Sequence, residues 1–116
     1  MVRDSALPRG IVRERMRKGA AVHATVRSYA SDRGLVDALV EREGEVRDLL
    51  TAIDGFRAYY MVRTPDGGAV SISVYDDAAG AEASNAAAAA WVRENLPDLA
   101  AAGPPTTTAG EIAVAF

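Results

Sequence analysis

The chain has 116 residues, a length that suits one domain with a single hydrophobic core. Its apolar fraction of 49% and charged fraction of 25% are those of an ordinary globular protein. It has no cysteine, which excludes disulfides, thiolate catalysis and cysteine metal sites. No apolar run approaches the ~20 residues needed to cross a bilayer, so we expect no membrane partner and a cytoplasmic location.

The net charge of −3 is divided unevenly along the chain. Residues 1–20 carry six basic and two acidic side chains, a balance of +4, which leaves −7 for residues 21–116. We interpret 1–20 as a basic N-terminal extension, flexible or loosely helical, and 21–116 as the folded domain; a translation start at Met16 is the alternative. An acidic domain repels phosphate backbones, so we expect no nucleic acid partner.

Residues 21–30 alternate in polarity, which is typical of a strand with one buried face. One side of this strand carries Val22, Ala24 and Val26, and the other carries His23, Thr25, Arg27 and Tyr29. Apolar residues then recur at three- and four-residue spacing, which predicts an amphipathic helix over about 34–53, capped by Ser31 or Asp32. Gly44 within it suggests a close contact with another helix.

The sequence TPDGGA joins two segments of alternating polarity and predicts a β-hairpin. A three-residue loop, 65–67, closed by Thr64 and Gly68, keeps the more apolar residues on one face and the more polar ones on the other. The first set is Phe56, Ala58, Tyr60, Val62, Val70, Ile72 and Val74. The second set is Arg57, Tyr59, Met61, Arg63, Ser71, Ser73 and Tyr75.

A second helix is predicted in AAGAEASNAAAAAWVRENL, capped by Asp76 or Asp77 and ended by Leu96 because Pro97 follows. Its alanines have little bulk, which would let the helix lie close to the sheet. A loop rich in proline and threonine then leads to a last strand in GEIAVAF, residues 110–116.

The order strand, helix, strand, strand, helix, strand predicts a ferredoxin-like α+β fold. Its four-stranded antiparallel sheet would have the order 4-1-3-2, with both helices on one face. We expect the first set to pack under the helices, together with Val22, Val26, Ile112 and Val114. The second set, with His23, Thr25, Arg27, Tyr29 and Glu111, would form an uncovered face too rich in large side chains for a monomer, so we expect a homodimer.

RNA recognition motifs share this element order and stack bases on aromatic residues of the first and third strands. Ser71 and Ser73 stand at those positions of the third strand in GGAVSISVY, which argues against RNA binding. The segment YASDRGL after the first strand also lacks the glycine-rich phosphate loop of an acylphosphatase.

The chain resembles the dimeric α+β barrel superfamily, in particular small proteins related to the antibiotic biosynthesis monooxygenases. The resemblance covers about residues 21–116 and rests on the element order and on three segments, IDGFRAYYMV, SISVYDD and SNAAAAAWVRENL. It implies a homodimeric barrel in which facing sheets leave an internal cavity. Members include cofactor-independent oxygenases of aromatic polyketide-like substrates, haem-degrading enzymes, isomerases and proteins without known activity.

The resemblance implies a small monooxygenase-like protein that binds an aromatic or polyketide-like molecule in the barrel cavity without a cofactor. Such chemistry needs a proton acceptor, a group that holds the developing oxyanion, and apolar walls. We predict His23 as the acceptor and Arg27 as the oxyanion group. The predicted substrate-binding residues are Tyr59, Met61, Ser71, Ser73, Tyr75 and Trp91.

The alternative is a non-catalytic ligand-binding or stress-response dimer whose second face is mainly the interface. His23 would then be a hydrogen-bonded interface residue, Arg27 would pair with Glu111, and Trp91 would be a packing residue. We expect no metal, because no histidine and carboxylate set has ligand spacing. Haem degradation is disfavoured because His23 is the only histidine and no helix carries an axial ligand.

Overall fold

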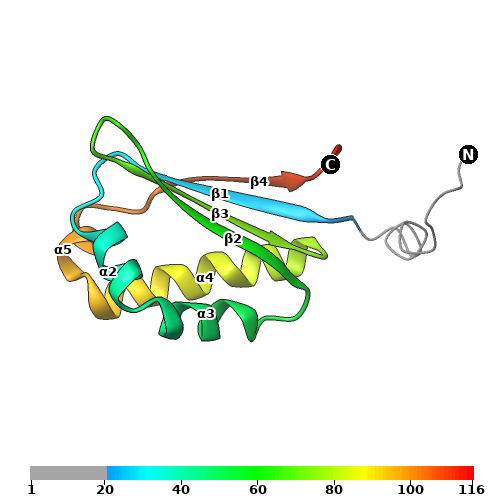
Figure 1. The fold of residues 1–116 in the computed structure, drawn as a ribbon, viewed down its shortest axis with the longest axis horizontal. Coiled ribbons are helices and arrows are strands. Elements are labelled where there is room, and N and C mark those ends of the chain that lie inside the picture. Colours follow the sequence, from blue (N-terminus) through cyan, green and yellow to red (C-terminus); the bar gives the residue numbers. More distant parts are fainter. Residues whose placement is uncertain (1–20) are drawn as a thin grey trace, which may run out of the picture.

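The computed structural model describes residues 21–116, so the predicted basic extension and the alternative start at Met16 lie outside the described residues. The elements are β1 (His23–Tyr29), α2 (Leu35–Glu41), α3 (Glu43–Thr51), β2 (Phe56–Arg63), β3 (Ala69–Tyr75), α4 (Ala78–Asn95), α5 (Pro97–Ala101) and β4 (Thr106–Glu111). The strands form one antiparallel sheet of order β2-β3-β1-β4, and the helices lie against one of its faces (Figure 1). The predicted ferredoxin-like α+β fold is confirmed, since this order is 4-1-3-2 read from the other edge.

The first predicted helix is two helices in the structure. Arg42, with φ −114° and ψ 33°, separates α2 from α3. Its guanidinium bonds to Glu45 and to Asn95 of α4, so the break lies where this segment contacts α4. Gly44 has no atom within 4 Å of the place where a Cβ would lie, so the predicted close helix contact there is wrong.

The hairpin has the predicted three-residue loop, closed by the amide of Thr64 donating to the carbonyl of Gly68 at 3.1 Å. The predicted register holds from Val62 opposite Val70 to Ala58 opposite Val74. A bulge then shifts the pairing, so that Phe56 rather than Arg57 lies opposite Tyr75. The bulge turns Phe56 toward the helices, where its ring meets that of Tyr75 edge-on at 5.6 Å.

The second predicted helix is confirmed, and the segment after it was only partly predicted. Asp77 caps α4 by accepting a bond from the amide of Gly80 at 2.9 Å. Pro97 then begins the short helix α5, which the sequence analysis missed. β4 begins at Thr106, within the predicted loop, because β-branched threonines suit a strand. Val114 lies beyond β4 and is exposed, so its predicted place in the core is wrong.

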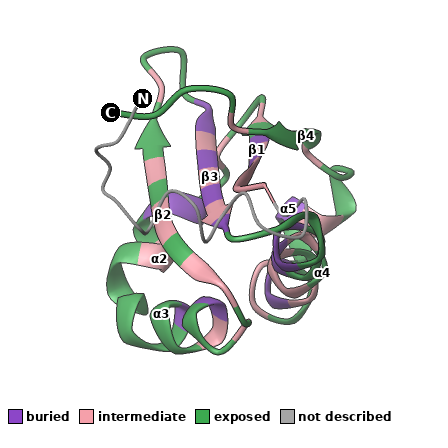
Figure 2. Cartoon of the chain, turned by 90° about the vertical axis from the view of Figure 1, so that its right-hand side faces the viewer, coloured by how far each residue is buried: buried purple, intermediate pink, exposed green. Residues whose placement is uncertain are grey.

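The assignment of the two sheet faces is wrong. Thr25, Arg27, Ser71, Ser73 and Tyr75 are buried, and the helices cover the side of the sheet that carries them. On the opposite side, here called the open side, Tyr60 is 58% and Val62 is 44% exposed. Figure 2 shows the resulting alternation of buried and intermediate residues along β3. The prediction failed because it assumed that the more apolar face must be the one under the helices.

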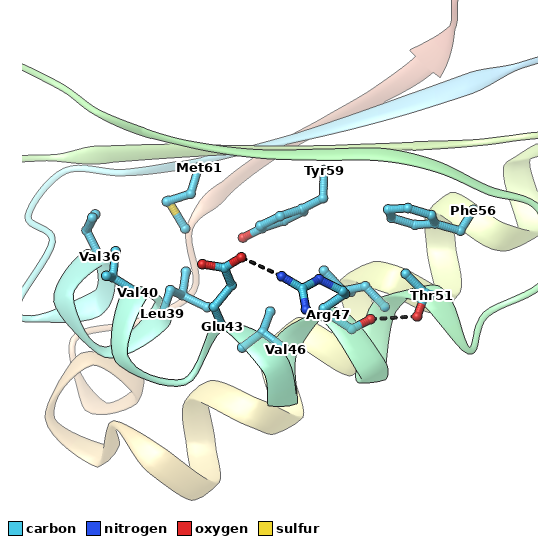
Figure 3. A pocket seen from close by; sticks show the side chains of 11 residues that line it. Val36, Leu39, Val40, Glu43, Val46, Arg47, Thr51, Phe56, Tyr59 and Met61 are labelled. Atoms are coloured by element: carbon cyan, nitrogen blue, oxygen red, sulfur yellow. Dashed lines mark hydrogen bonds and ion pairs between the residues drawn. The ribbon is translucent and has the colours of Figure 1, made fainter.

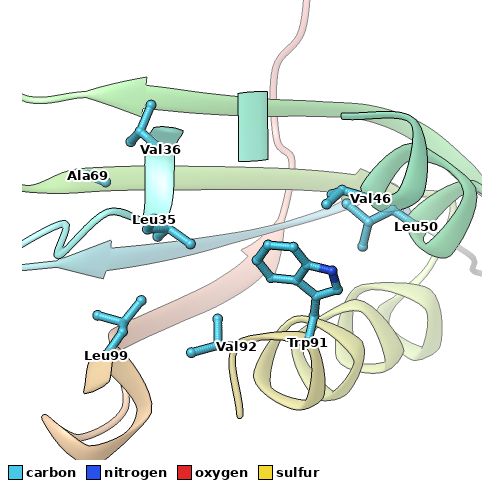
Figure 4. Close-up of a cluster of buried hydrophobic side chains, with 8 residues drawn as sticks. All are labelled: Leu35, Val36, Val46, Leu50, Ala69, Trp91, Val92 and Leu99. Carbon is cyan, nitrogen blue, oxygen red and sulfur yellow. The ribbon is translucent and has the colours of Figure 1, made fainter. Parts of the chain in front are cut away.

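The hydrophobic core lies between the sheet and the helices (Figure 4). Its buried members are Leu35, Val36, Val46, Leu50, Ala69, Trp91, Val92 and Leu99. Most come from the helices, and only Ala69 comes from a strand, because β1 and β3 present mainly polar side chains to this layer. The side chain of Trp91 on α4 is the largest in this buried set, and it fills space that the shorter side chains of the strands leave between sheet and helices.

Two glycines provide a matched test of the helix packing. A Cβ at Gly80 would lie 2.8 Å from Cδ2 of Tyr75, closer than real contacts allow. We expect Gly80→Ala to lower the free energy of unfolding by about 1–2 kcal/mol, because overpacking outweighs the gain in helix propensity. Gly44→Ala, which meets open space, should instead raise it by about 0.5–1 kcal/mol. Urea unfolding measures both, and a Gly80→Ala protein as stable as Gly44→Ala would contradict the packing described.

Candidate functional site

A buried arginine occupies the middle of the layer between sheet and helices. Arg27 on β1 is 3% exposed. Its Nε donates to Oγ of Ser71 at 2.9 Å and its Nη2 donates to Oγ of Ser73 at 2.6 Å, both on β3. Its Nη1 donates to Oδ1 of Asn85 on α4 at 2.5 Å. Oδ1 of Asn85 also accepts a bond from the hydroxyl of Thr25 at 3.0 Å.

The strand register explains this arrangement. Ser71 lies directly opposite Arg27, and Ser73 lies opposite Thr25, on the side of the sheet that faces the helices. The two serines leave room above β3 for the guanidinium, and their hydroxyl oxygens accept from its Nε and Nη2. Asn85 precedes the alanine run of α4, whose small side chains let the helix approach the sheet. The cluster therefore ties β1, β3 and α4 together through neutral polar atoms.

The charge of Arg27 has no acidic partner among residues 21–116, because none of the ion pairs there involves it. Burial lowers the pKa of Arg27, although the guanidinium keeps its charge at neutral pH. Burial also raises the pKa of Tyr29 and of Tyr59, against an opposing effect of the Arg27 charge. These tyrosines are therefore neutral at pH 7 and can donate a hydrogen bond.

Three adjoining hollows lie around this cluster. The inner cavity, of about 30 Å³, is lined by Arg27, Tyr29, Leu35, Leu39, Val46, Leu49, Leu50, Tyr59, Met61, Ser71, Ala88, Trp91 and Val92. It has room for water but not for an aromatic ring. A larger ligand must therefore enter one of the two open grooves beside it.

The α2–α3 groove, of about 350 Å³, lies between these helices and β2 (Figure 3). Its lining is mainly apolar, and it shares Tyr59 and Met61 with the inner cavity. Its charged lining residues, Glu43 and Arg47, form an ion pair with each other. This groove therefore offers an apolar surface whose charges are already neutralised.

The α4–α5 groove, of about 310 Å³, lies on the other side of the inner cavity. It is lined by Arg27, Tyr29, Asn85, Ala89, Val92, Arg93, Leu99, Ala100, Gly103, Pro104, Pro105 and Thr107. It shares Arg27, Tyr29 and Val92 with the inner cavity, so the guanidinium borders both spaces.

The structure brings most of the predicted site residues together. Arg27, Tyr59, Met61, Ser71 and Trp91 all line the inner cavity. Ser73 reaches this group through its bond to Arg27.

Two predicted site residues lie apart from this group. His23, at the start of β1, has Nδ1 2.8 Å from the carbonyl oxygen of Ala21 and lines none of the three hollows. Tyr75 is fully buried, and its hydroxyl donates to the carbonyl of Leu50 at 2.7 Å. The alternative pairing of Arg27 with Glu111 is wrong, because Arg27 lies opposite Thr107 while Glu111 lies opposite His23.

Asn85 and Tyr29 are site residues that the sequence analysis did not single out. Asn85 had a signal, since it is a polar residue at the start of the alanine run, one and two turns before Ala88 and Val92 on the same helix face. Tyr29 was correctly predicted to lie on the same side of the first strand as Arg27. The packing of α4 around Arg27 is what makes Tyr29 part of the site.

Trp91 joins the cavity wall to the helix pair on the other side. Its Nε1 donates to Oε2 of Glu45 at 3.1 Å, and the Arg42 guanidinium lies 5.4 Å from its ring centroid. Hydrogen bonds from Arg42 and Trp91 lower the pKa of Glu45. The indole is therefore held from two sides, which fixes the position of the cavity wall.

Metal-binding clusters and membrane-spanning helices are both absent from residues 21–116. This part of the chain has no group of three or more histidine, cysteine or acidic side chains placed to hold a metal ion. It also has no helix long and apolar enough to cross a membrane.

Comparison with solved structures identifies the fold. The chain is similar to NE2512 of Nitrosomonas europaea, a protein of unknown function, with 22% identity, a TM-score of 0.59, and coverage of 84% of this chain and 93% of the other. A monooxygenase from the gene ActVA-Orf6 of Streptomyces coelicolor, in complex with nanaomycin D, matches with 19% identity, a TM-score of 0.57, and coverage of 84% and 91%. A dimeric ferredoxin-like protein from an uncultured marine organism matches with 15% identity, a TM-score of 0.56, and coverage of 84% and 98%.

The chain shares the four-stranded, ferredoxin-like α+β fold of these solved structures. At these identities the likeness concerns the fold alone. No protein-family model matches the sequence, and no curated protein matches it either. The function of this chain therefore has to be argued from its own side chains.

Proposed function

We propose that this chain is a small monooxygenase-like protein that binds an aromatic or polyketide-like molecule without a cofactor. The ligand lies in the layer between sheet and helices, in one of the grooves beside the inner cavity. The observation that carries this proposal is the Arg27 guanidinium, buried among neutral partners and beside tyrosines, Met61 and Trp91. The shared fold of a monooxygenase that holds nanaomycin D supports it.

The proposed reaction draws its electrons from the substrate. A base removes the hydroxyl proton from an electron-rich phenol or quinol-like ring, and the resulting carbanion adds to O₂. The peroxide takes up that proton to form a hydroperoxide on the ring carbon. Loss of the hydrogen of this carbon and cleavage of the O–O bond then leave a carbonyl on the ring and release the second oxygen atom as water. Arg27 and the amide of Asn85 stabilise the oxyanion that develops, and the apolar walls strengthen this interaction by excluding water.

His23 remains the predicted proton acceptor, although it lies away from the hollows described. Because His23 lies apart from Arg27 along β1, a substitution at His23 tests its role separately from that of Arg27. A role for His23 requires the substrate to extend along β1 toward the start of the strand.

The function is tested by oxygen uptake with a panel of phenolic and quinol substrates. We expect Arg27→Met to lower the rate by about 10²–10³-fold, as removal of an oxyanion donor does. Arg57→Met is the matched control, because Arg57 is an exposed arginine paired with Asp76 outside the three hollows, and it should leave the rate unchanged. A His23→Ala protein with the full rate would remove the predicted role of His23. Absence of uptake across the panel would favour the non-catalytic ligand-binding dimer.

We also propose that the active form is a homodimer in which the open sides of two sheets face each other. The register places Val26, Ile72 and Tyr60 in one row across β1, β3 and β2 on this side, with Val70 and Val62 beside them. Such a surface is more apolar than monomers usually leave in water. The interface therefore differs from the one predicted, because the side chains assigned to it face the helices instead. The dimeric ferredoxin-like protein of similar fold supports this assembly.

A further inference from the structure

We infer that the α4–α5 groove selects ligands that carry a carboxylate, which binds Arg27 and Asn85 while the aromatic part lies along α4 and α5. This inference rests on the proposed small-molecule site between sheet and helices, and it names the ligand class and the groove. It concerns a charge that the ligand carries before any reaction, whereas the proposed oxyanion forms only during catalysis.

The first support is the charge of Arg27. A buried charge costs several kcal/mol of solvation unless an opposite charge or a full set of hydrogen bonds replaces the water. Arg27 is 3% exposed, and its partners Ser71, Ser73 and Asn85 are neutral. A carboxylate in the adjoining groove would supply the missing negative charge in surroundings of low dielectric constant.

The second support is the supply of unused donors. A guanidinium has five N–H groups, and the three bonds of Arg27 leave one N–H on each terminal nitrogen. Oδ1 of Asn85 is fixed by the two donors Thr25 and Arg27, which assigns the other side of the amide as its NH₂ group. That NH₂ group has no hydrogen-bond partner among the described residues, since both bonds of the Asn85 side chain there go to its Oδ1. Both side chains line the α4–α5 groove.

The third support is the composition of the groove. No acidic residue lines it, and Arg93 adds a second positive charge. Val92, Leu99 and Pro105 provide apolar walls, and the volume of about 310 Å³ is at the small end of ligand pockets. The α2–α3 groove lacks these features, because Glu43 and Arg47 neutralise each other there. A ligand with a charged end and a flat apolar body fits the first groove better.

The test compares two probes of the same shape, 2-naphthoate and 2-naphthamide, by isothermal titration calorimetry on the full chain. We expect naphthoate to bind about 10-fold or more tightly, the size of a charge-assisted hydrogen bond. Arg27→Met should abolish this preference, whereas Arg57→Met, which replaces an exposed arginine outside the groove, should retain it. Equal binding of the two probes to the wild-type protein would overturn the inference, as would a preference that survives Arg27→Met.

A second pair of variants locates the site without touching Arg27. Ala89 is an exposed residue of α4 that lines the groove, and Ala89→Phe should fill the groove and weaken naphthoate binding about 10-fold or more. Ala83 is exposed on the same helix and lines none of the three hollows, so Ala83→Phe should bind naphthoate normally. Unchanged binding to Ala89→Phe would overturn the choice of groove. Oxygen uptake with neutral substrates, together with no preference for naphthoate, would leave the proposed function standing and refute this inference alone.

Discussion

Arginine in place of Ile72 is expected to convert the proposed homodimer into a folded monomer. Ile72 lies at the centre of the open side of the sheet, between Val26 and Tyr60 in the cross-strand register. In a dimer whose open sides face each other, the new guanidinium would be buried beside its copy near the two-fold axis. Removing two like charges from water at one contact costs several kcal/mol. The fold should survive, because the helices cover the opposite side of the sheet.

Size-exclusion chromatography with light scattering measures this change, and circular dichroism checks that the monomer is folded. Val40→Arg is the matched control, because Val40 is a 65% exposed aliphatic residue on α2, away from the open side. It should remain dimeric. A wild-type protein that is monomeric at micromolar concentration, or an Ile72→Arg protein that stays dimeric, would refute the proposed interface.

Alanine in place of Trp91 is expected to lower the free energy of unfolding by about 3–5 kcal/mol, the usual cost of removing a large buried aromatic side chain. Trp91 is buried in the core between α4 and the helices α2 and α3 (Figure 4). Its loss also leaves Glu45 without the indole donor and Arg42 without the ring beneath it. Since small domains are stable by only about 5–15 kcal/mol, this one change removes a large share.

Urea unfolding followed by circular dichroism measures this loss, because the variant has no tryptophan fluorescence. Trp91→Phe is the graded control, since it keeps an aromatic ring in the core and removes the N–H donor. We expect it to cost clearly less than Trp91→Ala. A loss below about 1 kcal/mol for Trp91→Ala would mean that the core collapses around the gap without penalty, contrary to the close packing described.

The order and type of the elements were predictable because they depend on local signals. The alternation in residues 21–30, the cap at Asp77 and the stop before Pro97 each act over a few residues. The hairpin register was predictable because only a three-residue loop keeps each of the two sets of side chains on its own face of the sheet. The structure has this register from Ala58 to Val74. The break at Arg42 and the bulge after Phe56 escaped the sequence analysis because both depend on contacts with distant segments. The short helix α5 and the early start of β4 were also missed.

The candidate site was predictable in part. Arg27, Ser71 and Ser73 were placed on one face by alternation alone, and the hydroxyls of both serines do accept hydrogen bonds from Arg27. Asn85 was not predicted, because its position beside Arg27 depends on how closely α4 approaches the sheet. His23 lies away from the hollows because it is at the start of β1, although alternation puts it on the same side of the strand as Arg27.

By itself the sequence determined that this chain forms a four-stranded sheet with two different faces, because the period of a strand sorts its side chains without reference to anything else. Only the tertiary structure decided which face the helices cover. The aliphatic face around Ile72 and the polar face around Arg27 are both unsuited to full exposure to water. Each face therefore needs a different packing partner. The alanine-rich α4 can approach the serines of β3 and place Asn85 against Arg27, which leaves the aliphatic face open. That choice depends on the fit between α4 and β3, and such a fit exists only once the two elements are packed.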